Sequence, residues 1–467
     1  MADRQTPSRH LKAIWAWRHE SALRSRLGNI GHVLTGNMAG TILGLLAVAI
    51  AARSLGPHDY GVLALTITFA RAIERLVSFQ SWQPMIRYGA GLDPVDDRDT
   101  LRTLFKFGLV LDITAGIAAW LVAIAAAWAA TWWFGWTERT FQLTVVYCSL
   151  LLFNLQGMPT AVLRLAGRYR AAAYGQVASA IVRLGLCIGA ALTTGNLWTF
   201  AIIWMATQIL GSLIFLAVGF VQLRRQGITN ILSASLAGVT TRFPGLWNFT
   251  WSSNLSLTLR SSANQLDTLL VGALAGPAEA GLYHIAKQLG KMASQIGTQV
   301  QAVLYPDIAR LWAAGAVQAF RRAVVQVEVM LAAFGLISLA IAVVAAEPLL
   351  RLFAGPAFAA AAPLLIVQMF AVVLMISGTA THSALLAMGK AHQALAVVTA
   401  GTIAFHITLL LLVPRIGAMG ANVAHVVLGI IWVTGLAIML RRALRNTDDG
   451  APSVVPADLE IVPPGGA

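Results

Sequence analysis

Long apolar segments alternate with short polar or basic connections along most of the chain. Each apolar segment is close to the ~20 residues that an α-helix needs to cross ~30 Å of hydrocarbon. The pattern therefore predicts an all-α polytopic membrane protein with about 12 transmembrane helices. The predicted spans are residues 29–52, 60–86, 105–130, 141–164, 171–192, 197–221, 249–275, 281–305, 323–347, 363–387, 393–413 and 417–440.

The second half of the chain repeats features of the first half. A Gly-Pro turn at 55–61 recurs at 275–281, with its two glycines and its proline at a shift of 220 positions. The sequence Leu-Ala-Gly-Arg at 165–168 is matched by Ala-Met-Gly-Lys at 387–390, at a shift of 222. Because each repeat contains an even number of helices, the two halves enter the membrane in the same direction. We therefore expect two pseudo-symmetric six-helix lobes around a central cavity.

The repeat and the polar stretches together predict the domain organisation. The acid-free segment between the two repeats is expected to form a linker, and the Asp-, Pro- and Gly-rich end is expected to be disordered. The predicted parts are a basic cytoplasmic N-terminal segment (1–28), an N-lobe (29–221), a cytoplasmic linker (222–248), a C-lobe (249–440) and a disordered cytoplasmic tail (441–467).

The distribution of lysine and arginine predicts the orientation in the membrane. Of the 33 cations, 23 lie on the N-terminal segment, the tail and alternate connections, whereas the opposite connections hold four. Cytoplasmic loops retain positive charge, so both termini are expected to be cytoplasmic. The cations lie mostly beside spans, and for this reason the net charge of +14 does not indicate a nucleic-acid partner.

Composition supports the membrane class and excludes others. The chain is 58% hydrophobic and 11% charged, whereas water-soluble globular proteins are about 25% charged. Its two cysteines lie inside apolar segments, and its histidines lack metal-ligand spacing, so neither a disulfide framework nor a metal site is expected. The Gly-Lys pairs lack the rest of a Walker A motif, which excludes ATP hydrolysis by this chain. No cofactor is expected.

Ten charged residues fall inside the predicted spans. Each charge at bilayer depth costs about 2.5–3.5 kcal/mol, so ten lipid-facing charges would cost about 25–35 kcal/mol. They are therefore expected to face one another or water, and a cavity between helices is the simplest place for them. They are Arg71, Arg75, Arg183, Arg260, Lys287 and Lys291, together with Glu74, Asp112, Asp267 and Glu328.

The six cations are predicted to bind an anionic substrate, and the four acids to couple transport to an ion or to pair with the cations. Arg71 and Arg75 are one helical turn apart, as are Lys287 and Lys291, so each pair shares a face. Guanidinium groups can bind two phosphate oxygens at once. The alternative is internal pairing of the arginines with Glu74 or Asp112. The acids could also take up H⁺ or Na⁺.

Several stretches resemble a known family. They are AARSLGPHDYGVLAL, NQLDTLLVGALAGPAEAGLYHIAKQL, LFAGPAFAAAAPLLIVQMF, ALLAMGKAHQALAV and VPRIGAMGANVAH. They are similar to the polysaccharide transporter family of the multidrug/oligosaccharidyl-lipid/polysaccharide flippase superfamily, which includes the O-antigen-unit and capsule-unit flippases. The resemblance implies transfer of an undecaprenyl-pyrophosphate-linked oligosaccharide across the bacterial inner membrane. It also implies glycosyltransferases and a polysaccharide polymerase as partners.

Two other function classes remain as alternatives. A drug or cation exporter of the same superfamily would require an anionic cavity, whereas six cations against four acids leave an excess of two positive charges. A membrane enzyme acting on the same lipid carrier would require an extramembrane platform or a loop with grouped acids. The connections here are short or acid-free. We therefore predict a flippase without catalytic residues, which works by alternating access.

Overall fold

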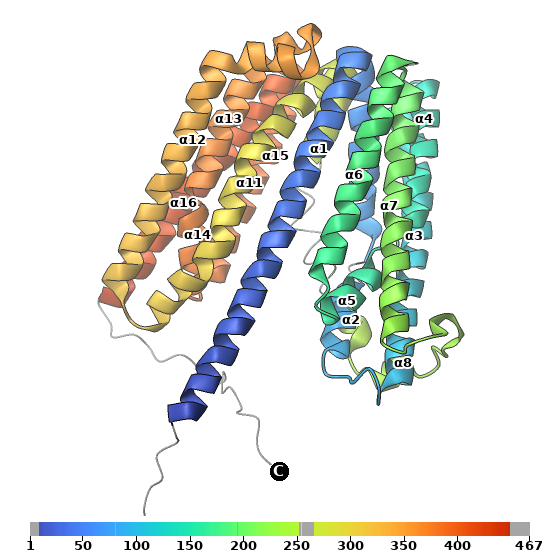
Figure 1. The fold of residues 1–467 in the computed structure, drawn as a ribbon. Coiled ribbons are helices and arrows are strands. Elements are labelled where there is room, and N and C mark those ends of the chain that lie inside the picture. Colours follow the sequence, from blue (N-terminus) through green and yellow to red (C-terminus); the bar gives the residue numbers. More distant parts are fainter. Residues whose placement is uncertain (1–8, 80, 194, 252–253, 255–265, 449–467) are drawn as a thin grey trace, which may run out of the picture. The chain divides into compact units, whose positions relative to one another are not determined.

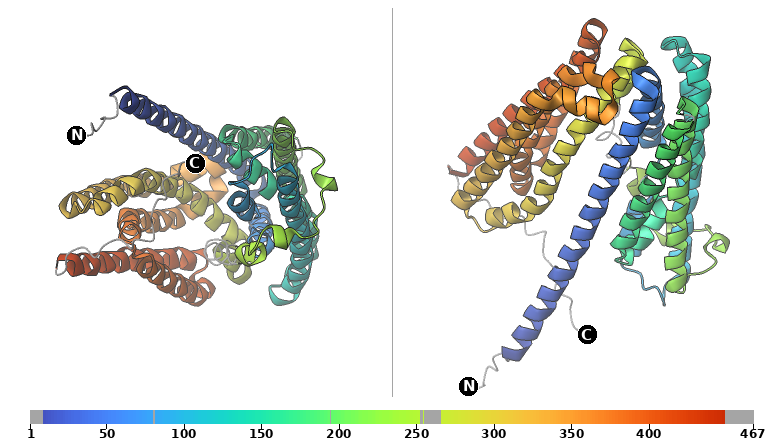
Figure 2. Two further views of the ribbon diagram at one scale, coloured as in Figure 1. Left: turned by 90° about the horizontal axis from the view of Figure 1, so that it is seen from below. Right: turned by 45° about the horizontal axis from the view of Figure 1, so that its top comes forward.

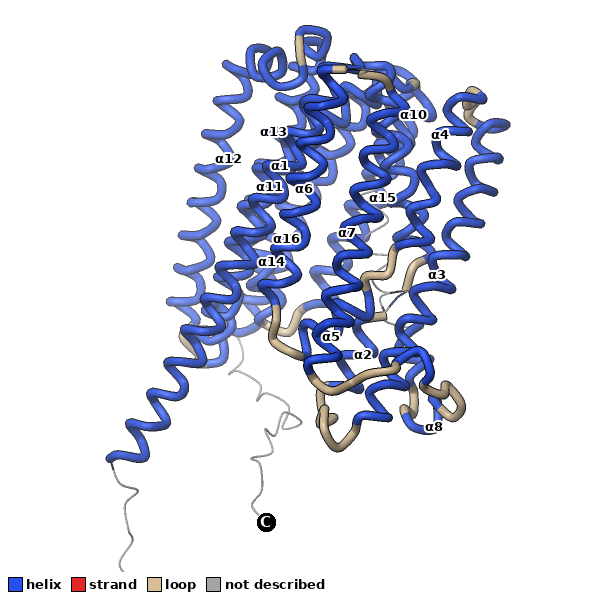
Figure 3. The backbone as a smooth tube through the Cα atoms, turned by 45° about the vertical axis from the view of Figure 1, so that its right-hand side comes forward, coloured by secondary structure: helices blue, strands red, loops and turns tan. Residues whose placement is uncertain are grey.

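The computed structural model describes residues 9–79, 81–193, 195–251, 254 and 266–448, and these form helices and loops without a strand (Figure 1, Figure 3). The chain divides into two compact units. The first comprises residues 1–281 with 353–355, and the second comprises 282–352 with 356–467. The predicted lobes differ from these units, because the predicted C-lobe begins at 249. The lobe division stays a prediction.

The first unit contains a long kinked helix, a series of shorter helices and the linker. Its elements are α1 (Arg9–Val77), α2 (Trp82–Gly89), α3 (Arg98–Trp133), α4 (Glu138–Cys148), η1 (Ser149–Phe153), α5 (Gly157–Leu165), α6 (Tyr169–Leu192), α7 (Leu197–Arg225), η2 (Ile231–Ser233), α8 (Val239–Arg242) and α10 (Leu266–Ala275).

The second unit is a bundle in which α15 packs along α16 and α13 packs against α16 (Figure 2). Its buried core includes Ile308, Phe320, Leu385 and Leu436. Its elements are α11 (Pro277–Ala313), whose first residues belong to the first unit, α12 (Val317–Ala354), η3 (Pro356–Ala361), α13 (Ala362–Ser377), α14 (Thr379–Ala387), α15 (Ala391–Ile416) and α16 (Ala418–Asp448).

The helices confirm the predicted class. Within the described ranges, eight segments are long and apolar enough to cross a membrane, and two shorter apolar helices, Val177–Leu192 and Leu266–Ala275, accompany them. Each of the twelve predicted spans overlaps a helix, although 249–275 does so chiefly through α10. The first predicted span falls in α1, where the backbone kinks at Gly56, and the second begins in α1 and extends beyond Val77 into α2. The protein is therefore an all-α polytopic membrane protein, and about twelve spans agree with its helices.

The two repeated Gly-Pro turns pack against each other within the first unit. Gly56 and Gly276 have φ angles of 70° and 91°, which an L side chain rarely adopts. A Cβ on Gly61 would overlap the carbonyl of Pro277, and a Cβ on Gly281 would overlap the carbonyl of Pro57. The contact is thus reciprocal, because each turn presents its glycine to the other turn's proline carbonyl. Glycine is needed at 61 and 281 for this close backbone approach.

The second repeated motif ends a helix in the same way in both units. After α5, the Arg168 amide donates to the Leu163 carbonyl at 2.8 Å, and Gly167 has a φ of 66°. After α14, the Lys390 amide donates to the Leu385 carbonyl at 2.8 Å, with Gly389 at 72°. These are Schellman caps, which require glycine at the left-handed position. The cap places a cation directly after each helix.

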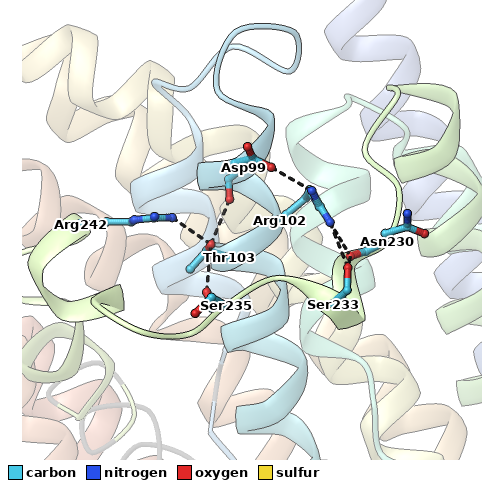
Figure 4. A network of polar contacts seen from close by, with 7 residues as sticks. All are labelled: Asp99, Arg102, Thr103, Asn230, Ser233, Ser235 and Arg242. Atoms are coloured by element: carbon cyan, nitrogen blue, oxygen red, sulfur yellow. Dashed lines mark hydrogen bonds and ion pairs between the residues drawn. The ribbon is translucent and has the colours of Figure 1, made fainter.

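The linker is part of the first unit's packing (Figure 4). Ile228, Ile231, Phe243 and Leu246 join a buried apolar cluster with residues of α2, α3 and α5. Polar contacts attach it to α3 as well. Arg102 donates to the Asn230 carbonyl (2.9 Å) and to Ser233 Oγ (3.1 Å). Lys106 donates to the Ala234 carbonyl (2.6 Å), and Thr103 donates to the Ser235 carbonyl (3.3 Å). Arg242 of the linker donates to Thr103 Oγ1 (3.2 Å).

Candidate functional site

A cluster of charged and polar side chains lies in the first unit around the second half of α1. Glu74 accepts a hydrogen bond from Asn154 Nδ2 at 2.8 Å. Arg71 and Arg75 lie close enough to Glu74 to attract its carboxylate. Arg71 is exposed, and its side chain forms no hydrogen bond or ion pair with a described residue. Arg71, Glu74 and Arg75 therefore lie close together, and Asn154 joins them from the loop between η1 and α5.

Arg183 on α6 joins this cluster, and its described partners are all neutral. Its Nε donates to Thr207 Oγ1 at 3.0 Å, and a terminal nitrogen donates to Gln208 Oε1 at 3.4 Å. Its guanidinium also lies 5.9 Å from the centre of the Trp204 ring. Arg183 is close enough to Arg71 for the two like charges to repel each other. With Arg75 and Glu74 included, the cluster has three cations and one acid.

Asp112 does not pair with an arginine of the cluster. Its carboxylate accepts hydrogen bonds from the Ser81 hydroxyl, from the Gly157 amide at 3.0 Å and from the Met158 amide at 3.2 Å. Gly157 begins α5, so Asp112 caps the N-terminus of this helix, where free amides and the helix dipole favour a negative charge. Its side chain is 6% exposed.

The α5 helix exists as a separate element because the predicted span 141–164 is broken. The α4 helix ends at Cys148, η1 follows, and residues 154–156 form an irregular turn before α5. Ser212 of α7 stabilises the break, since its hydroxyl donates to the Phe153 carbonyl at 2.5 Å and accepts from the Leu155 amide at 3.2 Å. Broken helices near the middle of a membrane are typical of transporters, where their ends bind ions or substrate groups.

The second unit contains a smaller break with a similar cap. The predicted span 363–387 is broken at Gly378, between α13 and α14. Glu328 of α12 accepts a hydrogen bond from the Thr381 amide at 3.1 Å, in the first turn of α14. In both units an acid from the preceding span therefore caps the half-helix that follows the break. This position gives Asp112 and Glu328 a structural role, whether or not they also bind an ion.

Three further predicted site residues lie on α10 and α11. Asp267 is 0% exposed and accepts from the Thr268 amide at 2.7 Å at the start of α10. Lys287 and Lys291 lie on α11 in the second unit, where the ammonium of Lys287 is 5.9 Å from the centre of the Tyr283 ring. Arg260 lies outside the described residues.

Sequence reasoning missed several polar partners. Asn154, Ser212, Thr207 and Gln208 are neutral residues inside apolar spans, and nothing in their local sequence marks them as partners. The breaks did carry a sequence pattern, because Gly157 and Gly378 lie at corresponding positions of the two halves, 221 residues apart. Interrupted spans at matching positions of a repeat indicate the functional region of a transporter.

The fold is shared with solved transporters. A multidrug resistance MATE family transporter of the MOP superfamily, in an inward-facing conformation, has a TM-score of 0.68 at 14% identity, over 87% of this chain and 96% of that chain. The lipid II flippase MurJ, in an inward closed conformation, has a TM-score of 0.64 at 13% identity, over 88% of this chain and 87% of that chain. A mutant of the Vibrio cholerae MATE transporter VcmN has a TM-score of 0.56 at 17% identity, over 91% of this chain and 98% of that chain. The class is thus a polytopic membrane protein with the MATE and MurJ fold.

The family follows from the sequence comparison. Residues 50–363 match the family described as polysaccharide biosynthesis protein, and the chain belongs to this family. The inner membrane protein YghQ of Escherichia coli (strain K12) is 28% identical over 295 residues, which are 63% of this chain and 83% of that protein. The resemblance to a polysaccharide transporter family is confirmed at this level.

Proposed function

We propose that the protein is a flippase that moves a lipid-linked oligosaccharide, carried on undecaprenyl pyrophosphate, across the bacterial inner membrane. The polysaccharide biosynthesis family supports a saccharide substrate, and the fold shared with the lipid II flippase MurJ supports a lipid-linked one. The similarity to a protein named inner membrane protein supports this location.

The observation that carries this proposal is the charge of the α1 cluster. Arg71 and Arg183 come from different helices and repel each other, and the described partners of Arg183 are neutral. A bound pyrophosphate would remove this repulsion, because its oxygens can accept bidentate hydrogen bonds from guanidinium groups. In a site of low dielectric constant such charge-assisted bonds are stronger than in water. The cluster is therefore suited to an anionic group at membrane depth.

The movement follows the alternating-access scheme of transporters built from repeats. The arginines bind the pyrophosphate, the glycan occupies the cavity, and the lipid tail stays in the bilayer. Because the chain lacks a Walker A motif, an H⁺ or Na⁺ gradient or consumption of the product supplies the energy. No residue has to form or break a covalent bond in this scheme.

A multidrug or cation exporter is the second candidate, because two of the similar folds are MATE transporters. A cationic substrate would be repelled by a cluster of three cations and one acid, so the charge disfavours this function. An enzyme acting on the lipid carrier is disfavoured as well. The hydroxyl and carboxylate that do meet beside a break, Ser81 and Asp112, are both buried, so a substrate cannot reach them.

The test is charge reversal at Arg71. We expect Arg71→Glu to reduce surface polysaccharide at least tenfold while the amount of protein in the membrane is unchanged, and Arg71→Lys to retain part of the activity because it keeps the charge without the bidentate geometry. Arg139→Glu is the matched control, since Arg139 is an exposed cation at the start of α4. Normal polysaccharide with Arg71→Glu would refute the proposed function. Increased resistance to cationic drugs would favour the exporter.

A further inference from the structure

A groove lies in the first unit between α7 and the turn that follows α5. Its volume is about 370 Å³, and it is partly open to the surface. None of its lining residues belongs to the α1 cluster. The lining residues are Leu163, Arg168, Ile214, Ala217, Val218, Val221, Gln222 and Arg225.

The lining changes from apolar to cationic along the α7 axis. The α7 positions in the groove follow the i, i+3, i+4, i+7, i+8, i+11 pattern and so form one stripe of the helix. From Ile214 to Val221 this stripe is apolar, then Gln222 follows, and Arg225 is the last residue of α7. At 1.5 Å per residue the stripe is about 16 Å long. It therefore has the length and polarity of an acyl chain with a polar head at one end.

The two arginines of the groove lack an acidic partner. Arg168 and Arg225 are exposed, and neither side chain forms an ion pair with a described residue. No acid lines the groove. The sequence explains this, because the segment between Glu138 and Asp267 contains nine arginines and no aspartate or glutamate. The compensating negative charge must come from outside this part of the chain.

The Schellman cap after α5 positions one of these arginines. The bond from the Arg168 amide to the Leu163 carbonyl turns the chain sharply, so that Arg168 and Leu163 both line the groove. The neighbouring arginines have other positions. Arg164 lies 4.2 Å from the centre of the Trp82 ring, and Arg224 does not line the groove.

We propose that this groove binds an anionic glycerophospholipid of the surrounding bilayer. Its phosphate lies between Arg168 and Arg225 and accepts hydrogen bonds from both guanidinium groups and from Gln222. One acyl chain lies along the apolar stripe against Leu163. Basic pockets between membrane helices on the cytoplasmic side bind anionic lipid headgroups in other membrane proteins. The lining contains few hydrogen-bonding groups, so it is suited to an acyl chain rather than to sugars, and the site is distinct from the proposed oligosaccharide site.

The test is lipid binding to the full-length protein, purified in a neutral detergent and titrated in native mass spectrometry with phosphatidylglycerol or phosphatidylcholine. We expect phosphatidylglycerol to bind more tightly. Arg168→Gln and Arg225→Gln should each weaken its binding about fivefold, and the double variant should weaken it about 25-fold. The reason is that each cation near an anionic lipid surface contributes about fivefold to the binding affinity. Phosphatidylcholine binding should change less than about twofold, because the arginines repel its choline ammonium, and this repulsion offsets their attraction for its phosphate.

Two further variants separate the groove from general surface charge. Arg224→Gln removes the neighbouring cation outside the groove and should leave phosphatidylglycerol binding nearly unchanged. Val218→Trp fills the apolar stripe and should weaken both lipids. Equal binding of the two lipids by the native protein, or an equal loss with Arg224→Gln and Arg225→Gln, would overturn the proposal. So would a polyprenyl diphosphate that displaces phosphatidylglycerol and depends on the same two arginines, because the groove would then serve the substrate.

Discussion

Replacing Asp112 distinguishes a helix cap from an ion carrier. In Asp112→Ala the amides of Gly157 and Met158 lose their acceptor in a site where the aspartate is 6% exposed, so water cannot replace it fully. Each buried donor left without a partner costs about 1–3 kcal/mol, and two cost about 2–6 kcal/mol. Loss of the Ser81 hydrogen bond adds to this cost.

The Asp112→Asn variant keeps the shape and most of these contacts. Both amides bind the same carboxylate oxygen, Oδ2, so the single oxygen of asparagine can accept from both. The asparagine amide then faces the Ser81 hydroxyl, which can rotate and accept its hydrogen bond. What is lost is the charge that roughly doubles the strength of such bonds, so we expect this variant to be destabilised by about 1–2 kcal/mol.

The assay is unfolding of the purified protein followed by tryptophan fluorescence, together with surface polysaccharide in cells. The expected order of stability is native, then Asp112→Asn, then Asp112→Ala, and Asp112→Asn should retain polysaccharide. Asp99→Asn on the same helix is the control, since it removes an exposed ion pair to Arg102 that contributes at most about 1 kcal/mol. A stable Asp112→Asn variant without polysaccharide would refute the cap as the main role and favour ion coupling. Native stability of Asp112→Ala would refute the cap itself.

Two further predictions concern the junction of the repeated turns and the linker. Gly61→Ala should lower the free energy of unfolding by about 1–3 kcal/mol, because its Cβ would overlap the backbone carbonyl of Pro277. The control is Gly189→Ala, whose Cβ would have no atom within 4 Å, and it should be neutral or stabilising in the same unfolding assay. Equal stability of the two variants would contradict the close packing. Arg102→Ala should release the linker at Asn230 and accelerate limited proteolysis there several-fold. Unchanged cleavage would show that apolar packing alone holds the linker.

The sequence was sufficient for the spans, the repeat and part of the α1 cluster. A bilayer leaves few solutions other than helices of about 20 apolar residues, so composition and spacing alone predict them. The Gly-Pro turns were readable because positive φ angles and close backbone contacts require glycine, as Gly56 and Gly61 illustrate. Arg71 and Arg75 were predicted to share a face because helical spacing places them there, and pairing with Glu74 was the stated alternative.

The tertiary structure alone decided the partners of these residues. Asp112 caps a helix that begins 45 residues later, and Arg183 binds Thr207 on the next helix, 24 residues away. An apolar segment that contains Gly157 or Gly378 can form one continuous helix or two half-helices. The choice depends on whether groups such as Ser212 and Asp112 are in position to accept and donate the hydrogen bonds that the break leaves open. Such partners come from other helices, and for that reason local sequence determined the spans and the charges, whereas packing between helices determined which of the charges gather at one site.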